Sequence, residues 1–543
     1  MPKPERPPTP RPRGLATALP LRGTTSPSGA RLRPVLVCAA ALLATGCTIG
    51  PRYTPPGSPP VQRYTAGAQP ARTPDAAGTS QHFAYGRALT AQWWTLFRSP
   101  ALDRLLQTAL KNNPTLEGAQ ATLRQAQATL QADEGVFYPQ VSGTLGVKRQ
   151  RFSGAVFGGG VPSRIFNLFT GNVNITYYPD FFGVNRLVYR QQNAQVDFQR
   201  FQMQAAYLTL ESNVVTLAIT AAELHAQIDA TRAIIADQAE ILALTQRRYG
   251  LGAAPYLDVV SQRSQLAAAR AALPPLEQRL AQTRHQLAVL AGAYPAQWKA
   301  HPWTLTELRL PESLPVTLPS TLVQRRPDIR AAEAQMRAAN AQVGIDTARM
   351  YPVVSLTASF GQESAKTGRF FNSAGNVWNV AADLAQPLFQ GGTLRAQRRA
   401  SQEAYRAMAA DYRKTVLGAF GQVADALRAV ENDARTLQAQ EAALSSSREA
   451  LKLARAQYAA GAIDYLRVLN AQVAYGNARI AALQARAQRL RDSAALFAAI
   501  GGGWWPGAAS SRAASDKPTG APAGAQGAST GAVHEAAADR RTP

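Results

Sequence analysis

The chain contains two similar halves, and this duplication constrains its fold more than any other feature. Residues 113–139 match residues 326–352 at a constant offset of 213 residues. In both copies a proline opens an alanine- and glutamine-rich segment, which leads to a Tyr-Pro pair and then to an alternating run. Residues 249–257 match 458–466 in the same way, at an offset of 209. We therefore expect one supersecondary unit used twice, as a pseudo-twofold duplication.

Each half contains a long apolar seam in which the spacing alternates between three and four residues. In the first half the seam runs from Tyr207 to Tyr249, within a helix predicted over 186–249. In the second half it runs from Val416 to Tyr458, and residues 466–497 continue the pattern. A period of 3.5 residues predicts helices packed side by side. A helix over 186–249 would be about 95 Å long, more than a compact soluble domain needs.

The assembly of these helices has two possible forms. Alanines beside the seams allow neighbours on both sides of a helix, and such a sheet of helices can close into a tube. An isolated antiparallel coiled coil would show the same seams, but we favour the tube. Pro274 and Pro275 are expected to split the descending helix of the first half into two stacked pieces.

Four shorter runs alternate apolar and polar residues with a period of two. They cover residues 141–148, 172–177, 354–360 and 378–384. This pattern predicts strands of a membrane β-barrel with a water-filled interior, although an ordinary half-buried antiparallel sheet would show it too.

Two loops are expected to join these runs pairwise, and both are rich in Gly, Phe, Ser and Arg. They cover residues 148–171 and 361–376. Such loops suit the outer side of a barrel. Their aromatic residues are expected at the lipid boundary, namely Phe166, Phe169, Phe370 and Phe371.

The number of strands bears on the oligomeric state. A sheet in lipid cannot leave open edges, because unsatisfied backbone groups are too costly there. The smallest membrane barrels have about eight strands, so four strands cannot close alone. If these strands span lipid, the chain must oligomerise, and three copies would supply twelve strands.

The N-terminal region has the pattern of a secretory leader. Arg31 and Arg33 precede an apolar run over residues 35–44, and the segment ends at Cys47. A cysteine after a short apolar run and a small residue resembles a bacterial lipobox, whose thiol accepts a lipid and becomes the mature N-terminus. We expect residues 1–46 to be removed and Cys47 to be lipidated. Thr48, by the same resemblance, favours sorting to the outer membrane.

The charge and the apolar content exclude some functions. The net charge is +24, and the first 46 residues contribute seven basic residues against Glu5, which leaves about +18 spread along the helices. Scattered charge on an exported chain argues against a nucleic-acid partner. No segment after Cys47 has about 20 continuous apolar residues, so no transmembrane helix is expected.

The sequence contains no pattern of catalytic or metal-binding chemistry. The five histidines lack metal-ligand spacing. There is no Gly-x-Ser-x-Gly elbow, phosphate-binding loop or Cys-x-x-Cys motif. We therefore expect no enzymatic activity, no cofactor and no metal, and energy for any transport must come from a partner.

Several motifs resemble one known family. The runs LPSTLVQRRPDIRAAEAQMRAANAQVGIDTARMYPVVSLTASFG (318–361) and QPLFQGGTLRAQ (386–397) are similar to the outer-membrane factor lipoproteins of tripartite RND-type drug-efflux systems, the NodT/TolC-like family. So are GCTIGPRYTPP (46–56) and WWTLF (93–97). The resemblance implies an α+β membrane protein, a homotrimer whose twelve-stranded transmembrane β-barrel takes four strands per chain. The barrel would continue into a periplasmic α-helical barrel about 100 Å long. The implied partners are a periplasmic adaptor protein, an inner-membrane transporter and outer-membrane lipid.

The resemblance also places two helix turns at the periplasmic tip. These turns cover residues 252–259 and 461–468, where Gly252 and Gly461 permit the reversals and the adaptor is expected to dock. The expected tip and gate residues are Tyr256, Asp258, Tyr458, Asp464, Arg467 and Asn470.

The second turn departs from the family pattern. Many relatives carry a sequence like DVLDAQ there, with acidic residues that narrow the pore, whereas this chain reads RVLNAQ. Arg467 and Asn470 thus replace the acidic residues. Our hypothesis is that Asp258 and Arg467 of neighbouring tips attract each other in the closed state, near Tyr458. The alternative is that both are solvated and unpaired.

These features predict a domain order and a function. The order is a leader (1–46), a lipidated extended segment (47–105), the first repeat (106–300), a Pro-rich connector (301–320), the second repeat (321–505) and a disordered tail (506–543). The expected function is a passive exit duct for small amphipathic compounds, and the alternative within transport is a channel for polypeptide secretion. Two other classes of protein are possible, namely a periplasmic adaptor and a coiled-coil lipoprotein without a pore. Adaptors typically have one helical hairpin, whereas two are expected here.

Overall fold

The computed structural model describes residues 49–67, 70–153 and 162–503. The leader, Cys47 and the tail at 506–543 lie outside the described residues, so the expectations for them stay predictions. Contacts divide the chain into two units. The sheet unit comprises Val136–Leu187 and Gly344–Leu394 with residues 49–50, and the helical unit comprises Pro51–Gly135, Val188–Val343 and the chain from Arg395 onward. Each unit takes segments from both halves of the sequence.

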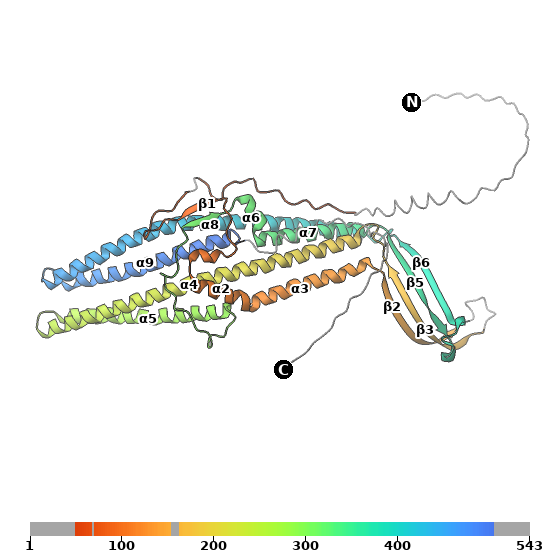
Figure 1. The fold of residues 1–543 in the computed structure, drawn as a ribbon, viewed down its shortest axis with the longest axis horizontal. Coiled ribbons are helices and arrows are strands. Elements are labelled where there is room, and N and C mark those ends of the chain that lie inside the picture. The colour runs from red at the N-terminus through yellow and green to blue at the C-terminus, as the bar shows by residue number, and fades with distance from the viewer. Residues whose placement is uncertain (1–48, 68–69, 154–161, 504–543) are drawn as a thin grey trace, which may run out of the picture. The chain divides into compact units, whose positions relative to one another are not determined.

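The sheet unit is built on four antiparallel strands in the order β2-β3-β5-β6 (Figure 1). Their bounds are β2 Gln140–Phe152, β3 Arg164–Tyr177, β5 Val353–Ser364 and β6 Asn376–Ala385. Each predicted run lies inside one of these strands. The loops were predicted too long, because β2 and β3 stay paired as far as Phe152 and Arg164 although Arg149 and Arg151 interrupt the apolar alternation.

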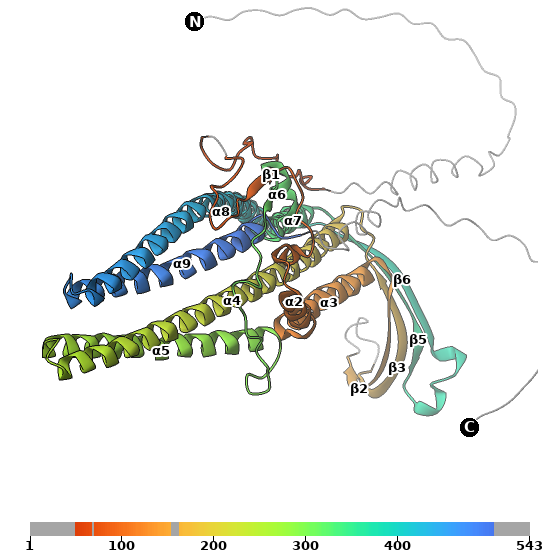
Figure 2. The same ribbon diagram turned by 60° about the vertical axis from the view of Figure 1, so that its left-hand side comes forward.

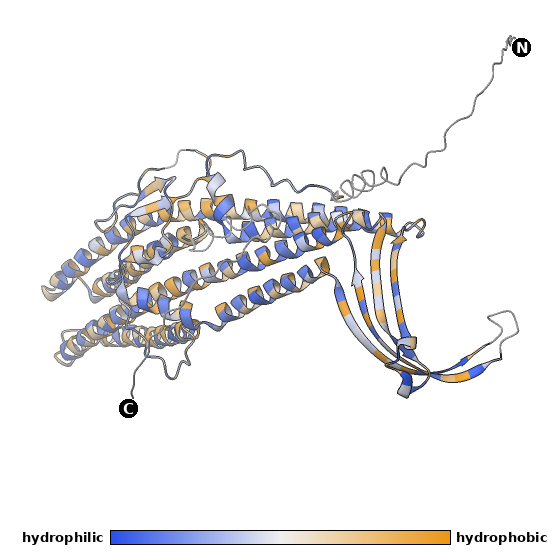
Figure 3. Ribbon diagram, turned by 45° about the vertical axis from the view of Figure 1, so that its right-hand side comes forward, coloured by the Kyte–Doolittle hydropathy of each residue, from blue (hydrophilic) through white to orange (hydrophobic). Residues whose placement is uncertain are grey.

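The register places the alternating apolar residues of the four predicted runs on one face. Leu145 lies opposite Gly171, Val173 opposite Phe360, and Phe360 opposite Trp378. Directly paired residues point to the same side of a sheet and successive residues to opposite sides. The apolar sets of the four strands therefore share a surface, which we call the apolar face, and the alternation is visible along the strands in Figure 3.

The opposite surface, the polar face, carries mainly hydroxyl, amide and carboxyl groups. Its members include Ser142, Thr144, Asn172, Asn174, Thr357, Ser359, Asn379 and Asp383. Two of the aromatic residues expected at the lipid boundary lie on different faces. Phe169 is opposite Val147 on the apolar face, whereas Phe166 is opposite Gln150 on the polar face. The expectation for Phe166 stays a prediction, and the register adds that β3 extends beyond the predicted strand and places this residue on the polar face.

Both outer edges of the sheet are open. Within the described residues β2 pairs only with β3, and β6 pairs only with β5. The outward-pointing N–H and C=O groups of these two strands thus have no strand partner in one copy of the chain.

Two pairs of long helices dominate the helical unit and reflect the duplication. Helices α4 (Val184–Gly250) and α8 (Thr393–Ala459) have 67 residues each, and α5 (Tyr256–Leu290) and α9 (Tyr465–Ala499) have 35 each. A 67-residue helix is about 100 Å long. Figures 1 and 2 both show α4 beside α5 and α8 beside α9, as two hairpins. The shorter helices α3 (Pro114–Glu134) and α7 (Pro327–Ala348) are also related by the repeat.

The expected break in the first descending helix is absent. Pro274 and Pro275 lie inside α5, which runs continuously from Tyr256 to Leu290. Proline removes one backbone donor and crowds the preceding turn. However, Leu266 and Leu280 on either side both stay buried, so side-chain packing holds the helix across the prolines.

The core of the helical unit is aromatic where the N-terminal segment meets the helices. The short helix η1 (Trp93–Phe97) buries Trp93 and Phe97 completely, and α2 (Pro100–Asn112) follows it. Trp93 lies 5.7 Å from Phe497 of α9 between ring centroids. In α4, one window is long and apolar enough to cross a membrane by length and composition alone, which the sequence analysis did not expect. Val214 and Ile219 of α4 are fully buried in this core.

Residues 71–85, here called the strap, are held on the helices mainly by one arginine, with further hydrogen bonds from Gln81 to Ser493 and from the Ala77 N–H to Glu441. Strand β1 (His82–Tyr85) pairs in parallel with β4 (Ser313–Val316), which precedes the helix α6 (Pro319–Arg325). Arg489 of α9 is 2% exposed, and burial lowers its pKa. It donates hydrogen bonds to strap oxygens, namely Gln81 Oε1 at 3.1 Å, Ala76 O at 3.1 Å, Thr79 O at 3.0 Å and Thr73 Oγ1 at 3.3 Å.

Candidate functional site

The two helix turns predicted as docking sites have the same backbone geometry. Gly252 has φ +71° and Gly461 has φ +74°, the left-handed conformation that favours glycine. In the first turn the Gly252 N–H donates to Tyr249 O at 2.9 Å, and the Ala253 N–H donates to Arg248 O at 2.8 Å. This pair of bonds is the Schellman motif, which closes a helix C-terminus.

The second turn repeats this pattern. The Gly461 N–H donates to Tyr458 O at 3.0 Å, and the Ala462 N–H donates to Gln457 O at 2.9 Å. The turns differ at the start of the following helix. Asp464 caps α9, since its side chain accepts from the Arg467 N–H, whereas Pro255 precedes α5 and supplies no side-chain cap.

A tyrosine pair closes each turn. The rings of Tyr249 and Tyr256 are 5.4 Å apart, and those of Tyr458 and Tyr465 are 5.7 Å apart. Tyr256 is 54% exposed, whereas Tyr465 is buried. The sequence repeat predicted this correspondence, but the difference in burial depends on the second hairpin packing against the first.

Arg248 connects the two turns. Its guanidinium carbon lies 4.5 Å from the centroid of the Tyr458 ring, a cation–π contact between α4 and α8. The partly buried Asp258 lies in the same environment. Burial raises the pKa of its carboxyl, the negative charge of Asp464 raises it further, and Arg248 opposes both effects.

A buried polar network lies deeper between the hairpins. Gln262 of α5 has no exposed surface, and its Oε1 accepts a hydrogen bond from the Tyr465 hydroxyl. Its amide donates to Gln238 O on α4 at 2.9 Å. Burial raises the pKa of Tyr465, so this hydroxyl stays protonated and acts as the donor. These bonds tie α4, α5 and α9 together.

The structure does not pair Asp258 with Arg467 within one chain. The nearest acidic partner of Arg467 is Asp464, at 4.0 Å, and both side chains are more than two-thirds exposed. Asn470 is exposed as well. An ion pair between Asp258 and Arg467 thus stays a hypothesis about neighbouring copies.

Arg248 and Gln262 were not predicted from the sequence as functional residues. By the 209-residue offset they correspond to Gln457 and Ala471, so both positions break the repeat. Such mismatches within an otherwise matching segment mark where the two hairpins must differ, and they could have directed attention to both residues.

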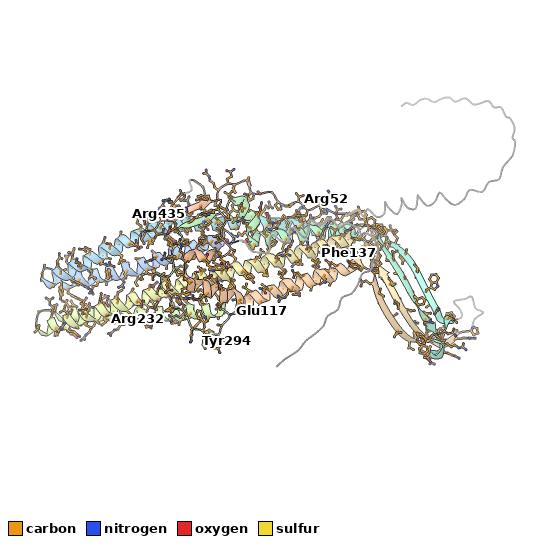
Figure 4. The ribbon with its side chains drawn as sticks, in the orientation of Figure 1. Arg52, Glu117, Phe137, Arg232, Tyr294 and Arg435 are labelled. Atoms are coloured by element: carbon orange, nitrogen blue, oxygen red, sulfur yellow. The ribbon has the colours of Figure 1, made fainter. Side chains whose placement is uncertain are left out.

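Several ion pairs of the helical unit join neighbouring helices. Arg232 of α4 pairs with Glu277 of α5 at 2.8 Å, and Arg455 of α8 pairs with Asp237 of α4 at 3.6 Å. Figure 4 labels Arg232 near the α4–α5 hairpin. Across the residues described by the structure, no three His, Cys, Asp or Glu side chains are grouped as metal ligands.

The fold and sequence match known channel proteins. The family model for "Outer membrane efflux protein" matches residues 105–293 and 318–502, one segment in each half. The pyoverdine export outer membrane protein OpmQ of Pseudomonas aeruginosa PAO1 is 33% identical over 417 residues, which are 76% of this chain and 87% of the relative. The probable efflux pump outer membrane protein TtgC of Pseudomonas putida KT2440 is 29% identical over 489 residues, 89% of this chain and 99% of the relative.

A solved structure agrees with these relatives. The outer-membrane channel OprN has a TM-score of 0.77 and 26% sequence identity, and the match covers 85% of this chain and 100% of that one. The protein is thus of the outer-membrane channel class. The chain belongs to the outer membrane efflux protein family, whose members are channel proteins that form the outer-membrane exit of efflux systems.

Proposed function

We propose that this chain forms the passive exit duct of a tripartite efflux system, as a trimer with a closed barrel of twelve strands. The observation that carries this proposal is the four-stranded sheet with one apolar face, one polar face and two open edges. Lipid offers no water to satisfy edge groups, so each edge needs a further strand. Strand β6 of one copy beside β2 of the next supplies it, with apolar side chains toward lipid and polar ones toward a wet lumen.

The long helices continue the duct through the periplasm. Two 67-residue helices per chain are long enough for a helical barrel of about 100 Å. The Gly252 and Gly461 turns end the two hairpins and dock the periplasmic adaptor. An inner-membrane transporter supplies the energy, and a lipid on Cys47 anchors the mature N-terminus once residues 1–46 are removed.

The cargo consists of small amphipathic compounds. The names of the relatives refer to pyoverdine, antibiotic and toluene export, and these cargoes share little beyond small size. This range supports a duct that selects weakly, with selectivity in the transporter. The alternative, polypeptide secretion, has no support from these relatives.

Single-channel recording tests the duct directly. The purified protein in a planar lipid bilayer should give discrete conductance steps, and loss of the protein from cells should raise internal accumulation of small amphipathic dyes. A protein that inserts into the bilayer without any conductance would contradict the proposal.

The gate involves Asp258 and Arg467 of neighbouring copies. Arg467 is exposed and its bond to Asp464 is long, so it is available to a second partner. Arg467→Ala and Asp258→Asn should each raise the open probability, and the exchange Asp258→Arg with Arg467→Asp should lower it again. If all three variants stay closed like the parent, both residues are simply solvated.

A further inference from the structure

The turn between β5 and β6 folds back onto the apolar face of the sheet. A Cβ atom placed on Gly171 would lie 2.8 Å from Cζ of Phe370 and 3.1 Å from Cδ2 of Leu145, so the Phe370 ring fills the space that glycine leaves. The turn is ordered by the short helices η4 (Thr367–Arg369) and η5 (Ser373–Gly375), and it is visible at the ends of β5 and β6 in Figure 2.

The contact leaves an apolar cavity and one projecting aromatic ring. A cavity of about 400 Å³ is lined by Leu145, Val147, Phe169, Thr367, Phe370 and Phe371 among others. Phe371 packs edge-on to Phe370 at 5.2 Å but is 90% exposed. This end of the apolar face thus offers a hydrophobic surface that no described residue covers.

Four basic residues belong to this end of the sheet and its turn, and we call them the basic rim: Arg149, Arg151, Lys366 and Arg369. In the register Arg149 is opposite Asn167 and Arg151 opposite Ile165, which continues the apolar face beyond Val147. Lys366 and Arg369 belong to the turn that contacts this face at Gly171 through Phe370. All four are exposed, and in the part of the chain that the structure describes none makes a side-chain hydrogen bond or ion pair.

The acidic residues of the sheet lie on the other face. Glu363 is opposite Thr170, and Asp383 is opposite Ser355, both on the polar face. The basic rim therefore has no acidic neighbour among the described sheet residues of its own face. A cationic cluster beside exposed apolar and aromatic groups complements a molecule with phosphate groups joined to hydrocarbon chains. A free anion would contact only the basic side chains and would leave the apolar surface exposed to water.

We propose that the basic rim binds the phosphate groups of a lipid in the outer leaflet, while Phe371 and the cavity contact its acyl chains. This inference rests on the proposed function, because it requires the apolar face to lie in lipid. Arg149 and Arg151 are the two rim residues whose side of the sheet is fixed by the strand register, so they are the contacts that the test addresses. Phe371 is an exposed aromatic ring, and such rings favour the membrane interface.

Titration of lipid A into the purified full-length protein in neutral detergent tests the proposal. Each cation near an anionic lipid contributes about fivefold in affinity at low salt. The double variant Arg149→Gln with Arg151→Gln should weaken binding about 25-fold, and Arg149→Lys with Arg151→Lys should restore most of it. The matched control, Lys148→Gln with Arg164→Gln, removes the same charge from the polar face and should change the affinity less than twofold.

Two measurements on the parent protein need no variant. Lipid A stripped of its phosphates should bind the parent at least as weakly as intact lipid A binds the double variant, because it loses the contacts with all four basic side chains. A large excess of inorganic phosphate should not displace bound lipid A. Equal binding of the two lipids, equal loss in the polar-face control, or displacement by inorganic phosphate would each overturn the proposal. Conductance in pure phosphatidylcholine separates the proposed lipid site from the proposed duct. A channel that conducts but binds both forms of lipid A equally would reject only the lipid site. A protein that does not conduct would reject the duct.

Discussion

Glu211 is a carboxylic acid enclosed in the aromatic core of the helical unit. It is 1% exposed, and its Oε2 accepts a hydrogen bond from the Trp93 indole N–H at 3.0 Å. Burial raises its pKa to about 8, and the bond from Trp93 lowers it only partly. The folded protein thus keeps a proton on Glu211 that the unfolded chain, with an ordinary carboxyl pKa, releases.

This difference predicts a pH-dependent stability. Because the folded pKa is raised, the stabilising proton is fully bound below about pH 4.5 and is lost as the pH rises through about 8. The free energy of unfolding should therefore fall across this window, by up to about 1.4 kcal/mol per pH unit. Glu211→Gln keeps an acceptor for Trp93 and should flatten that part of the profile of apparent Tm against pH.

An exposed glutamate on the same helix provides the comparison. Glu240→Gln should leave the profile unchanged, since Glu240 lies at the surface of α4. A Glu211→Gln profile that follows the parent at every pH would show that Glu211 is already ionised in the fold.

Arg489 illustrates a residue whose role could not be found from its neighbours in sequence. Its hydrogen-bond acceptors lie more than 400 residues away in the strap. Lysine cannot reproduce the fork of a guanidinium, so Arg489→Lys leaves buried oxygens unpaired at a cost of about 2 kcal/mol or more. We expect the strap to detach, so that the backbone around Arg72 and Arg87, whose side chains are already exposed, becomes free to enter the active site of trypsin.

Limited proteolysis measures this effect. The first cleavage in Arg489→Lys should fall at Arg72 or Arg87 and should be at least tenfold faster than in the parent. Arg486→Lys, on an exposed position of the same helix, should be cut at the parental rate. Equal rates in both variants would mean that the strap is held mainly by β1 and its partner β4.

At the scale of elements, periodicity was a reliable guide. The seam from Tyr207 to Tyr249 predicted a helix over 186–249, and α4 runs over Val184–Gly250. Alternation located all four strands, and the register adds that their apolar sets share one face. These patterns arise from side chains close in sequence, so they can be recognised without a structure.

The errors at this scale have a common cause. The prediction of a helix break at Pro274 was wrong, because α5 is buried on both sides of the prolines and this packing outweighs their local effect. The ends of β2 and β3 were placed too early because pairing between strands continues past the apolar residues. The contact of Arg248 with Tyr458 joins residues 210 apart. Each of these depends on a partner that is distant in sequence.

The two Schellman turns support a prediction about hairpin order. Gly252→Ala and Gly461→Ala place a side chain at positive φ and should cost about 1 kcal/mol each. Amides of residues 248–256 or 457–465 should then exchange faster with deuterium in the respective variant. Gly250→Ala is the matched control, because Gly250 ends α4 with open space around it and alanine there favours the helix. Faster exchange in Gly250→Ala as well would show that any side chain disturbs the turn.

At the scale of the whole molecule, the sequence predicted the class of protein, and family membership confirmed it. The proposed trimer follows from the open edges at β2 and β6, which one copy cannot satisfy in lipid. The gate and docking residues stay predictions, because their partners belong to other copies or other proteins. A single chain can show which side chains are available but not what they meet.

The most direct test of the account is the number of chains in the detergent-extracted particle, measured by native mass spectrometry of the unboiled protein. The account predicts one dominant species of three chains, which dissociates to single chains only on heating and which conducts when placed in a bilayer. A stable single-chain particle that does not conduct would contradict it, because the β2 and β6 edges would then be satisfied without a second copy.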